Sequence, residues 1–351
     1  MSAGAVLRFD YATRSTRVLL GVGVSDRLAE VLDRAAIGRV VVVATPGRRE
    51  AVAQLRAHLG DRCLGAFERA ALHVPRTLVI DALRVVGAVK PDGLVAIGGG
   101  SAIGLAKALA RETALPIVAL PTTYSGSEMT SVWGITDGDR KRTGRDARVL
   151  ARVVLYDPVL SVPLPALASA TSGVNAIAHA VEALYAPEDD PVASLLAEEA
   201  IGRLARTLPR VVARPDDLAM RADAFYGAHL AGRALEMTSM GLHHKLCHVL
   251  GGTFGLPHAL THSVLLPHVV AYNAVAAPGA MRRIAVALAV PDAPEGLVAL
   301  NATLGIDATL GRLGLKESDL DRAADLAADN AYANPAPVTR DGVLGILRRA
   351  L

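Results

Sequence analysis

The chain has 351 residues, of which 52% are hydrophobic, so it is long enough for one large domain or two moderate ones with a sizeable buried core. No uninterrupted apolar run approaches the roughly 20 residues that cross a bilayer, which argues against a membrane protein. The net charge is +3, from 37 basic and 34 acidic residues spread along the chain with few aromatic neighbours, which argues against a nucleic-acid binder.

The cysteine content and the amino terminus bear on the cellular compartment. Cys63 and Cys247 are too few for a disulfide framework and form no CxxC pair. The first residues lack the charged start, the long apolar stretch and the small-residue cleavage site of a signal peptide. We therefore expect a cytoplasmic protein whose two cysteines are buried thiols.

Short apolar runs alternate with helical patterns in the first half of the chain. Residues 39–44, 94–97 and 116–120 are continuous apolar runs bounded by Gly or Pro. Such runs are typical of strands in a parallel sheet that is covered on both faces. The sequence therefore predicts an α/β domain over residues 1–160.

The pattern changes after a last strand-like run at residues 153–156. Residues 157–165 are rich in proline, which blocks helix interiors and central strands, so this segment is interpreted as a linker. Helical periodicity with Ala, Leu, Arg and Glu then continues to the end and predicts an all-helical domain over residues 161–351. The basic and irregular segment 140–152 is interpreted as a solvated loop.

A glycine-rich turn follows the second apolar run directly and opens a helical pattern. It consists of Gly98, Gly99, Gly100 and Ser101. Glycines let the backbone approach a pyrophosphate closely, and the free N–H groups of a helix start attract its charge. The turn is therefore a candidate dinucleotide site, although it is not a GxGxxG motif and glycine-rich turns also occur without a ligand.

Two further strand ends carry candidate cofactor residues. Hydroxyl groups crowd residues 121–130, at the sheet edge where open α/β sheets bind ligands, although a turn of this composition also satisfies its own backbone. The cofactor candidates at these strand ends are Thr45, Thr122, Thr123 and Ser127. Residues 45–49 include no acid to bind a ribose 2′-hydroxyl or repel an extra phosphate, so we expect NADPH to be accepted as well as NADH.

Four of the ten histidines are placed in a pattern that suits a site. Asn175 and His179 are four residues apart, as are His244 and His248, so each pair lies on one helical face. A Gly- and Pro-rich break then precedes His258, which opens another helix. The alternative is that single histidines cap helices or satisfy core carbonyls, but paired spacing favours a catalytic or metal-binding cluster.

Taken together, these segments resemble the iron-type (group III) alcohol dehydrogenase superfamily, and more narrowly its maleylacetate reductases. The similarity spans nearly the whole chain and rests on residues 98–110 (GGGSAIGLAKALA), 121–137 (PTTYSGSEMTSVWGITD), 156–160 (YDPVL), 172–186 (SGVNAIAHAVEALYA) and 243–268 (HHKLCHVLGGTFGLPHALTHSVLLPH). The resemblance implies the fold of dehydroquinate synthase and iron-type alcohol dehydrogenases, with an amino-terminal dinucleotide-binding domain, a helical catalytic domain, a cleft between them and commonly a homodimer.

The resemblance also implies where a metal would be held. In metal-dependent members the ligands are an acid and three histidines, and their positions fall here on Asn175, His179, His244 and His258. Asn175 offers a neutral carbonyl where those members have a carboxylate, so a dication loses one countercharge. Gly104 likewise replaces an acid, and both departures match the maleylacetate reductases. We therefore expect no metal requirement, with zinc or iron disfavoured.

A maleylacetate reductase uses NADH or NADPH to reduce the conjugated C=C bond of maleylacetate, a small dicarboxylate, to 3-oxoadipate during the degradation of aromatic compounds. Hydride addition to the alkene leaves an enolate, which His179 and His244 are then expected to stabilise. His248 is the expected proton donor or orienting partner, and His258 is the remaining member of the cluster. The candidate substrate-binding residues are Asn175, Tyr124, Ser125 and Lys245, with Thr130 and Arg340 as further possibilities.

Two other interpretations stay open. One is a metal-dependent alcohol or aldehyde dehydrogenase of the same fold, which requires Asn175 to serve as a ligand. The other is a non-catalytic nucleotide-binding protein that uses its helical half as an interaction surface, which the histidine pairs disfavour.

Overall fold

The computed structural model describes residues 14–138, 140–329 and 332–351, so part of the amino terminus examined above lies outside the described residues. The amino-terminal half contains a six-stranded parallel sheet with the order β1-β8-β5-β4-β2-β3. Its strands are β1 Arg17–Leu20, β2 Val40–Ala44, β3 Cys63–Phe67, β4 Gly93–Gly98, β5 Ile117–Pro121 and β8 Val153–Tyr156. The predicted parallel α/β fold is confirmed.

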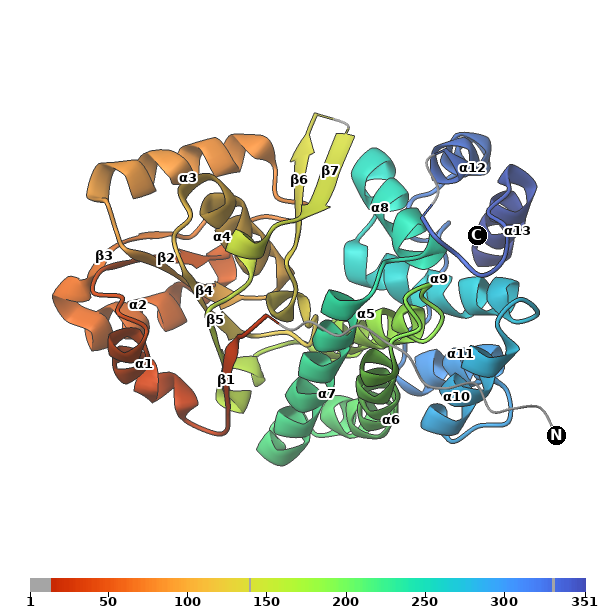
Figure 1. The fold of residues 1–351 in the computed structure, drawn as a ribbon, viewed down its shortest axis with the longest axis horizontal. Coiled ribbons are helices and arrows are strands. Elements are labelled where there is room, and N and C mark those ends of the chain that lie inside the picture. Colours follow the sequence, from red (N-terminus) through yellow and green to blue (C-terminus); the bar gives the residue numbers. More distant parts are fainter. Residues whose placement is uncertain (1–13, 139, 330–331) are drawn as a thin grey trace, which may run out of the picture.

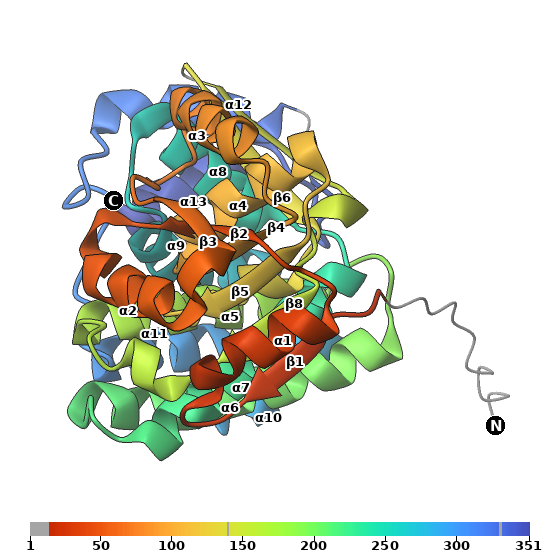
Figure 2. The same ribbon diagram turned by 90° about the vertical axis from the view of Figure 1, so that its left-hand side faces the viewer.

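Helices cover both faces of this sheet, which explains why its central strands are apolar on both sides. The helices are α1 Leu28–Arg34, α2 Arg49–Leu59, α3 Arg76–Val89 and α4 Gly100–Thr113. Figure 2 shows α1 and α2 on one side of the sheet and α3 and α4 on the other. Val40 and Val42 pack in one core with α1 and α2, whereas Val41 and Val43 pack in another with α3 and α4. Alternate side chains of one strand thus point to opposite faces, as the strand geometry requires.

The carboxy-terminal half is helical, as predicted, and its first long helix begins ten residues after β8 ends (Figure 1). The helices are α5 Ala166–Ala183, α6 Pro191–Ala213, α7 Leu218–Met237, α8 Leu242–Phe254, α9 His258–Asn273, α10 Pro278–Leu288, α11 Ala293–Thr303, α12 Leu320–Ala328 and α13 Arg340–Ala350. The stretch Pro278–Thr303 is long and apolar enough to cross a membrane by composition, but it consists of the separate helices α10 and α11.

One segment differs from the sequence-based interpretation. Residues 140–152 do not form a solvated loop, because β7 (Arg140–Arg145) pairs antiparallel with β6 (Val132–Asp137) in a hairpin. The hairpin leaves the sheet and lies against α8 of the helical domain (Figure 1). β7 has the sequence RKRTGR, with three consecutive basic residues and a glycine, and this composition indicates a loop rather than a strand.

The two cysteines are free thiols, as expected. Cys247 is buried on α8, but Cys63 at the start of β3 is only half-buried, because β3 is an edge strand with one neighbour.

Candidate active site

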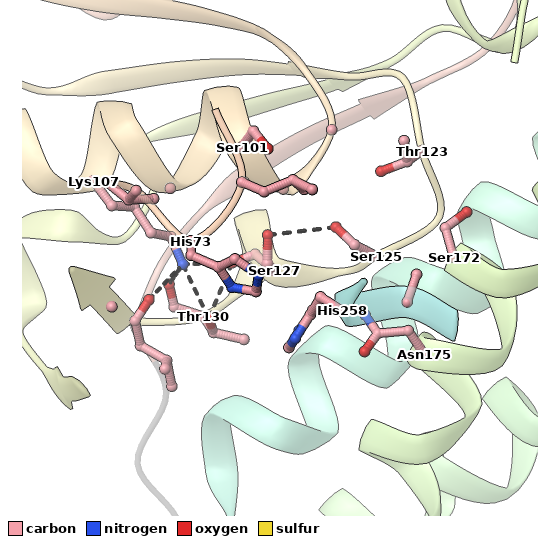
Figure 3. Close-up of a pocket in the computed structure, with 18 of the residues that line it drawn as sticks. His73, Ser101, Lys107, Thr123, Ser125, Ser127, Thr130, Ser172, Asn175 and His258 are labelled. Carbon is pink, nitrogen blue, oxygen red and sulfur yellow. Dashed lines mark hydrogen bonds between the residues drawn. The ribbon is translucent and has the colours of Figure 1, made fainter. Parts of the chain in front are cut away.

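A cavity of about 490 Å³ lies between the carboxyl ends of the sheet strands and the helices α5, α8 and α9. Most of the predicted site residues line it, and they come from both domains. From the first domain these are Thr45, Gly99, Gly100, Ser101, Thr122, Thr123, Ser125, Ser127 and Thr130, and from the second Asn175, His179, His244, His248 and His258. Figure 3 shows Asn175 and His258 facing Ser125, Ser127 and His73 across this space.

The glycine turn has the backbone of a phosphate-binding loop. Gly99 is the N-cap of α4, and a Cβ on it would come within 2.7 Å of Thr123 Cγ2, so only glycine fits there. A Cβ on Gly100 would meet nothing within 4 Å, which leaves open space beside the first turn of a 14-residue helix. Gly98 does not line the cavity, but its φ of 146° suits glycine. The turn therefore fits the pyrophosphate of a dinucleotide.

Lys107 on α4 holds the loop that follows β5, a role that the sequence alone did not reveal. Its Nζ donates to the carbonyl oxygens of Ser127 at 2.6 Å, Thr130 at 2.7 Å and Val132 at 2.9 Å (Figure 3). Burial lowers the pKa of Lys107 to about 7. The contacts fix the loop that presents Ser125 and Ser127 to the cavity.

The imidazoles of α5, α8 and α9 form one contiguous cluster. The rings of His179 and His244 stack with their centroids 5.0 Å apart, and the centroids of His248 and His258 are 6.4 Å apart. His262, one turn after His258 on α9, joins the cluster with its ring centroid 4.3 Å from that of His258. Burial lowers the pKa values of His179, His248 and His258 well below that of ordinary histidine, so these rings are neutral at pH 7.

Glu182 is a candidate functional residue that was not predicted from the sequence. It is fully buried on α5, and its carboxylate accepts hydrogen bonds from His244 Nδ1 at 2.6 Å and from the backbone N–H groups of Gly241 and His243. Burial opposes its ionisation most strongly, but His244, His243 and the Gly241 N–H together outweigh burial and lower the pKa of Glu182. Its position three residues after His179, on the same helix, was the available signal.

The Glu182 contact determines which nitrogen of His244 is available for chemistry. Because Nδ1 is engaged by the carboxylate, Nε2 is the free ring atom, and it has no hydrogen-bond partner among the described residues. A carboxylate behind an imidazole orients the ring and stabilises its protonated form. The pair is therefore a candidate proton donor with a defined direction.

Three predicted substrate contacts are not among the residues that line the cavity. The Tyr124 hydroxyl is buried and accepts a hydrogen bond from the Arg221 guanidinium at 2.9 Å. Lys245 Nζ lies 5.6 Å from the centre of the Tyr332 ring, since it is one residue past His244 on the helix. Arg340 is paired with Asp321 and Asp325 at the surface.

The four positions that hold a metal in the superfamily carry no carboxylate here, because Asn175 stands where metal-dependent members have an acid. Among the described residues, Asn175 Oδ1, His179 Nδ1 and His258 Nδ1 have no hydrogen-bond partner. In the part of the chain that the structure describes, two groups have ligand atoms close enough to share a metal: Glu182 with His243 and His244, and His243 with Cys247 and His262. Neither includes His179 or His258, and Glu182 already accepts three hydrogen bonds.

No aspartate or glutamate is among the described residues that line the cavity. Its charged or ionisable side chains are all basic, namely Arg48, His73, Lys107, Lys141 and the four predicted histidines. Such a cavity favours anions at both its cofactor end and its histidine end.

The amino-acid sequence of the chain is similar to those of known protein families. Sequence models of the families described as "Iron-containing alcohol dehydrogenase" and "Fe-containing alcohol dehydrogenase family, C-terminal" match residues 15–158 and 169–351. The chain is 48% identical to a maleylacetate reductase of Pseudomonas sp. (strain P51), over 98% of each chain.

Solved structures of similar proteins cover the same length. The maleylacetate reductase of Rhizobium sp. strain MTP-10005 matches with a TM-score of 0.92 and 41% identity over 99% of each chain. That of Agrobacterium tumefaciens matches with a TM-score of 0.93 and 40% identity, again over 99% of each chain.

Proposed function

This chain belongs to the iron-containing alcohol dehydrogenase family, and from that premise we propose that it is a maleylacetate reductase. It uses NADH or NADPH to reduce the conjugated C=C bond of maleylacetate, which gives 3-oxoadipate. The observation that carries the proposal is the cavity lining, which combines a histidine cluster with basic side chains and has no acid among the described residues. A dianionic substrate meets no repulsion there, whereas a neutral alcohol or aldehyde has no use for the positive charge.

The first domain holds the nicotinamide cofactor. The turn at Gly99 and Gly100 faces the pyrophosphate, and the hydroxyls of Ser101, Thr122 and Thr123 line the same part of the cavity. When bound, the reduced cofactor supplies a hydride to the substrate alkene.

Residues of the second domain stabilise the charge that moves onto the ketone oxygen. His244 Nε2 donates a proton or a hydrogen bond to that oxygen, and the Glu182 carboxylate, which contacts Nδ1, orients the ring for this role. His179, stacked on His244, offers an N–H donor beside it. His248, whose Nδ1 lies 3.4 Å from the Tyr332 hydroxyl, is the candidate that relays a proton to carbon, and because the resting ring is neutral it takes up one proton as it delivers the other.

We further propose that the reaction requires no metal. The argument is the donor set, in which Asn175 supplies a neutral carbonyl where metal-dependent members have a carboxylate, so that a dication loses one countercharge. A carboxylate behind a histidine serves metal sites and proton donors alike, so Glu182 does not decide between them. The homodimer and the cytoplasmic location that the sequence predicts are part of the same proposal.

The function is tested by following NADH absorbance with purified protein. We expect rapid NADH oxidation with maleylacetate, at least a hundredfold lower kcat/KM with simple aldehydes, and unchanged activity after treatment with EDTA. Activity that is lost on chelation and restored only by added Fe²⁺ or Zn²⁺ contradicts the metal-free proposal. Oxidation of NADH by aldehydes but not by maleylacetate contradicts the function itself, and oxidation by neither favours a binding protein.

The cofactor preference is a separate prediction. Arg48 and Thr45 line the cavity after β2, and no acid stands there to repel the phosphate of NADPH. We expect kcat/KM values for NADH and NADPH that differ by less than a hundredfold. Arg48→Gln is expected to lower kcat/KM for NADPH about tenfold while NADH, the internal control, changes little. A preference for NADH above a hundredfold contradicts this prediction.

A further inference from the structure

We propose that Lys141 binds one terminal carboxylate of the substrate and thereby gives the enzyme its preference for dicarboxylates, an inference that rests on the proposed function. Lys141 lies on β7, in the segment that the sequence alone presents as a solvated loop. The hairpin carries its side chain into the cavity lining that also contains His248 and His258.

Two glycines, one from each domain, make room for the lysine side chain. A Cβ on Gly134 of β6 would lie 3.2 Å from Lys141 Cε, and a Cβ on Gly252 of α8 would lie 3.1 Å from Lys141 Cβ. Larger residues at either position would displace the lysine stem. The side chain is therefore held between the hairpin and the helical domain.

The other cations near the cavity are already engaged. Lys107 donates to three backbone carbonyls, and Arg48 Nη1 lies 3.4 Å from the Leu160 carbonyl. Among the lysines and arginines that line the cavity, within the described residues, Lys141 alone has no hydrogen-bond or ion-pair partner.

An unpaired cation inside a cavity is costly unless an anion accompanies it. Burial lowers the pKa of Lys141 to about 8, which shows that its surroundings leave the charge uncompensated. The neighbouring imidazoles cannot supply the missing anion, and no acid is among the described residues that line the cavity. A substrate carboxylate supplies it, and maleylacetate carries two, so one end can reach Lys141 while the ketone faces His244.

The experiment separates binding from catalysis with two inert acids that differ by one carboxylate. Adipate and hexanoate are titrated by calorimetry into the enzyme with its nicotinamide cofactor bound, using wild type, Lys141→Met, Lys141→Arg and the control Arg142→Met. Arg142 is exposed on the same strand, so its substitution changes the hairpin charge equally without altering the cavity. Thermal melts establish that all variants fold.

We expect Lys141→Met to weaken adipate binding about 30-fold and to leave hexanoate within threefold of wild type. Lys141→Arg is expected to keep the preference for adipate, and Arg142→Met to match wild type. In turnover with maleylacetate, Lys141→Met is expected to raise KM about 30-fold with kcat within threefold, because the contact is made equally in the ground and transition states.

Unchanged adipate binding by a folded Lys141→Met variant overturns the inference. Because that titration needs no turnover, it remains decisive if the wild-type enzyme does not reduce maleylacetate, a result that would overturn the proposed function instead.

Discussion

His244→Ala is expected to lower kcat with maleylacetate about a thousandfold while the Kd for NADH stays within threefold of wild type. The imidazole faces the histidine end of the cavity, and the cofactor turn belongs to the other domain. Its loss removes the group that meets the developing charge and also leaves the buried Glu182 carboxylate without its partner. Steady-state kinetics give kcat, and quenching of NADH fluorescence gives Kd.

The control for this variant is His268→Ala, which removes a half-buried imidazole of α9 that is absent from the cavity lining. It is expected to retain wild-type kcat. Glu182→Gln keeps a hydrogen-bond acceptor but removes the charge, so kcat is expected to fall about 10- to 100-fold. Near-normal turnover of a folded His244→Ala enzyme refutes the role assigned to His244.

Asn175→Asp is expected to lower kcat/KM for maleylacetate about a hundredfold. The substitution places a carboxylate in a cavity where no acid lies among the described lining residues, and like charges a few ångströms apart repel by a few kcal/mol at a partly buried site. The same change is expected to strengthen Zn²⁺ binding at least tenfold, because a dication regains a countercharge. Kinetics and calorimetric titration with Zn²⁺ measure the two effects.

Asn175→Ala separates charge from shape at this position. It removes the amide without adding charge, so a smaller loss of kcat/KM and no gain in Zn²⁺ affinity are expected. Two results contradict the account of the cavity: an Asn175→Asp enzyme that reduces maleylacetate as well as wild type, or a wild type that binds Zn²⁺ as tightly as that variant.

The parts of the fold that were predictable from sequence have local causes. The runs at residues 94–97 and 116–120 lie within or overlap β4 and β5, because strands buried on both faces must be apolar throughout. The glycine turn and the histidine pairs could also be predicted from neighbouring residues. The glycines are consecutive in the sequence, and the members of each pair lie one helical turn apart.

The rest of the site depends on partners far apart in sequence. Tyr124 was expected to bind substrate, but its hydroxyl accepts a hydrogen bond from Arg221, which lies 97 residues later in the sequence. Glutamate is usually exposed, but Glu182 is buried, because Gly241 and His244 supply the hydrogen-bond donors that its carboxylate needs. Lys141 sits among charged residues that indicate a loop, and only the packing of β7 on α8 brings it into the cavity. No local pattern encodes these contacts.

Gly104 lines the cavity, as do His73 and Val74. A Cβ at position 104 would come within 2.9 Å of Val74 Cγ2, and both His73 and Val74 have positive φ angles, of 61° and 49°. β-Branched residues rarely adopt such angles, so this segment is shaped around the missing side chain. A side chain at position 104 therefore requires Val74 to move, whereas aspartate has nearly the same size and shape as Asn175. Space restricts substitution at position 104, and charge restricts it at position 175.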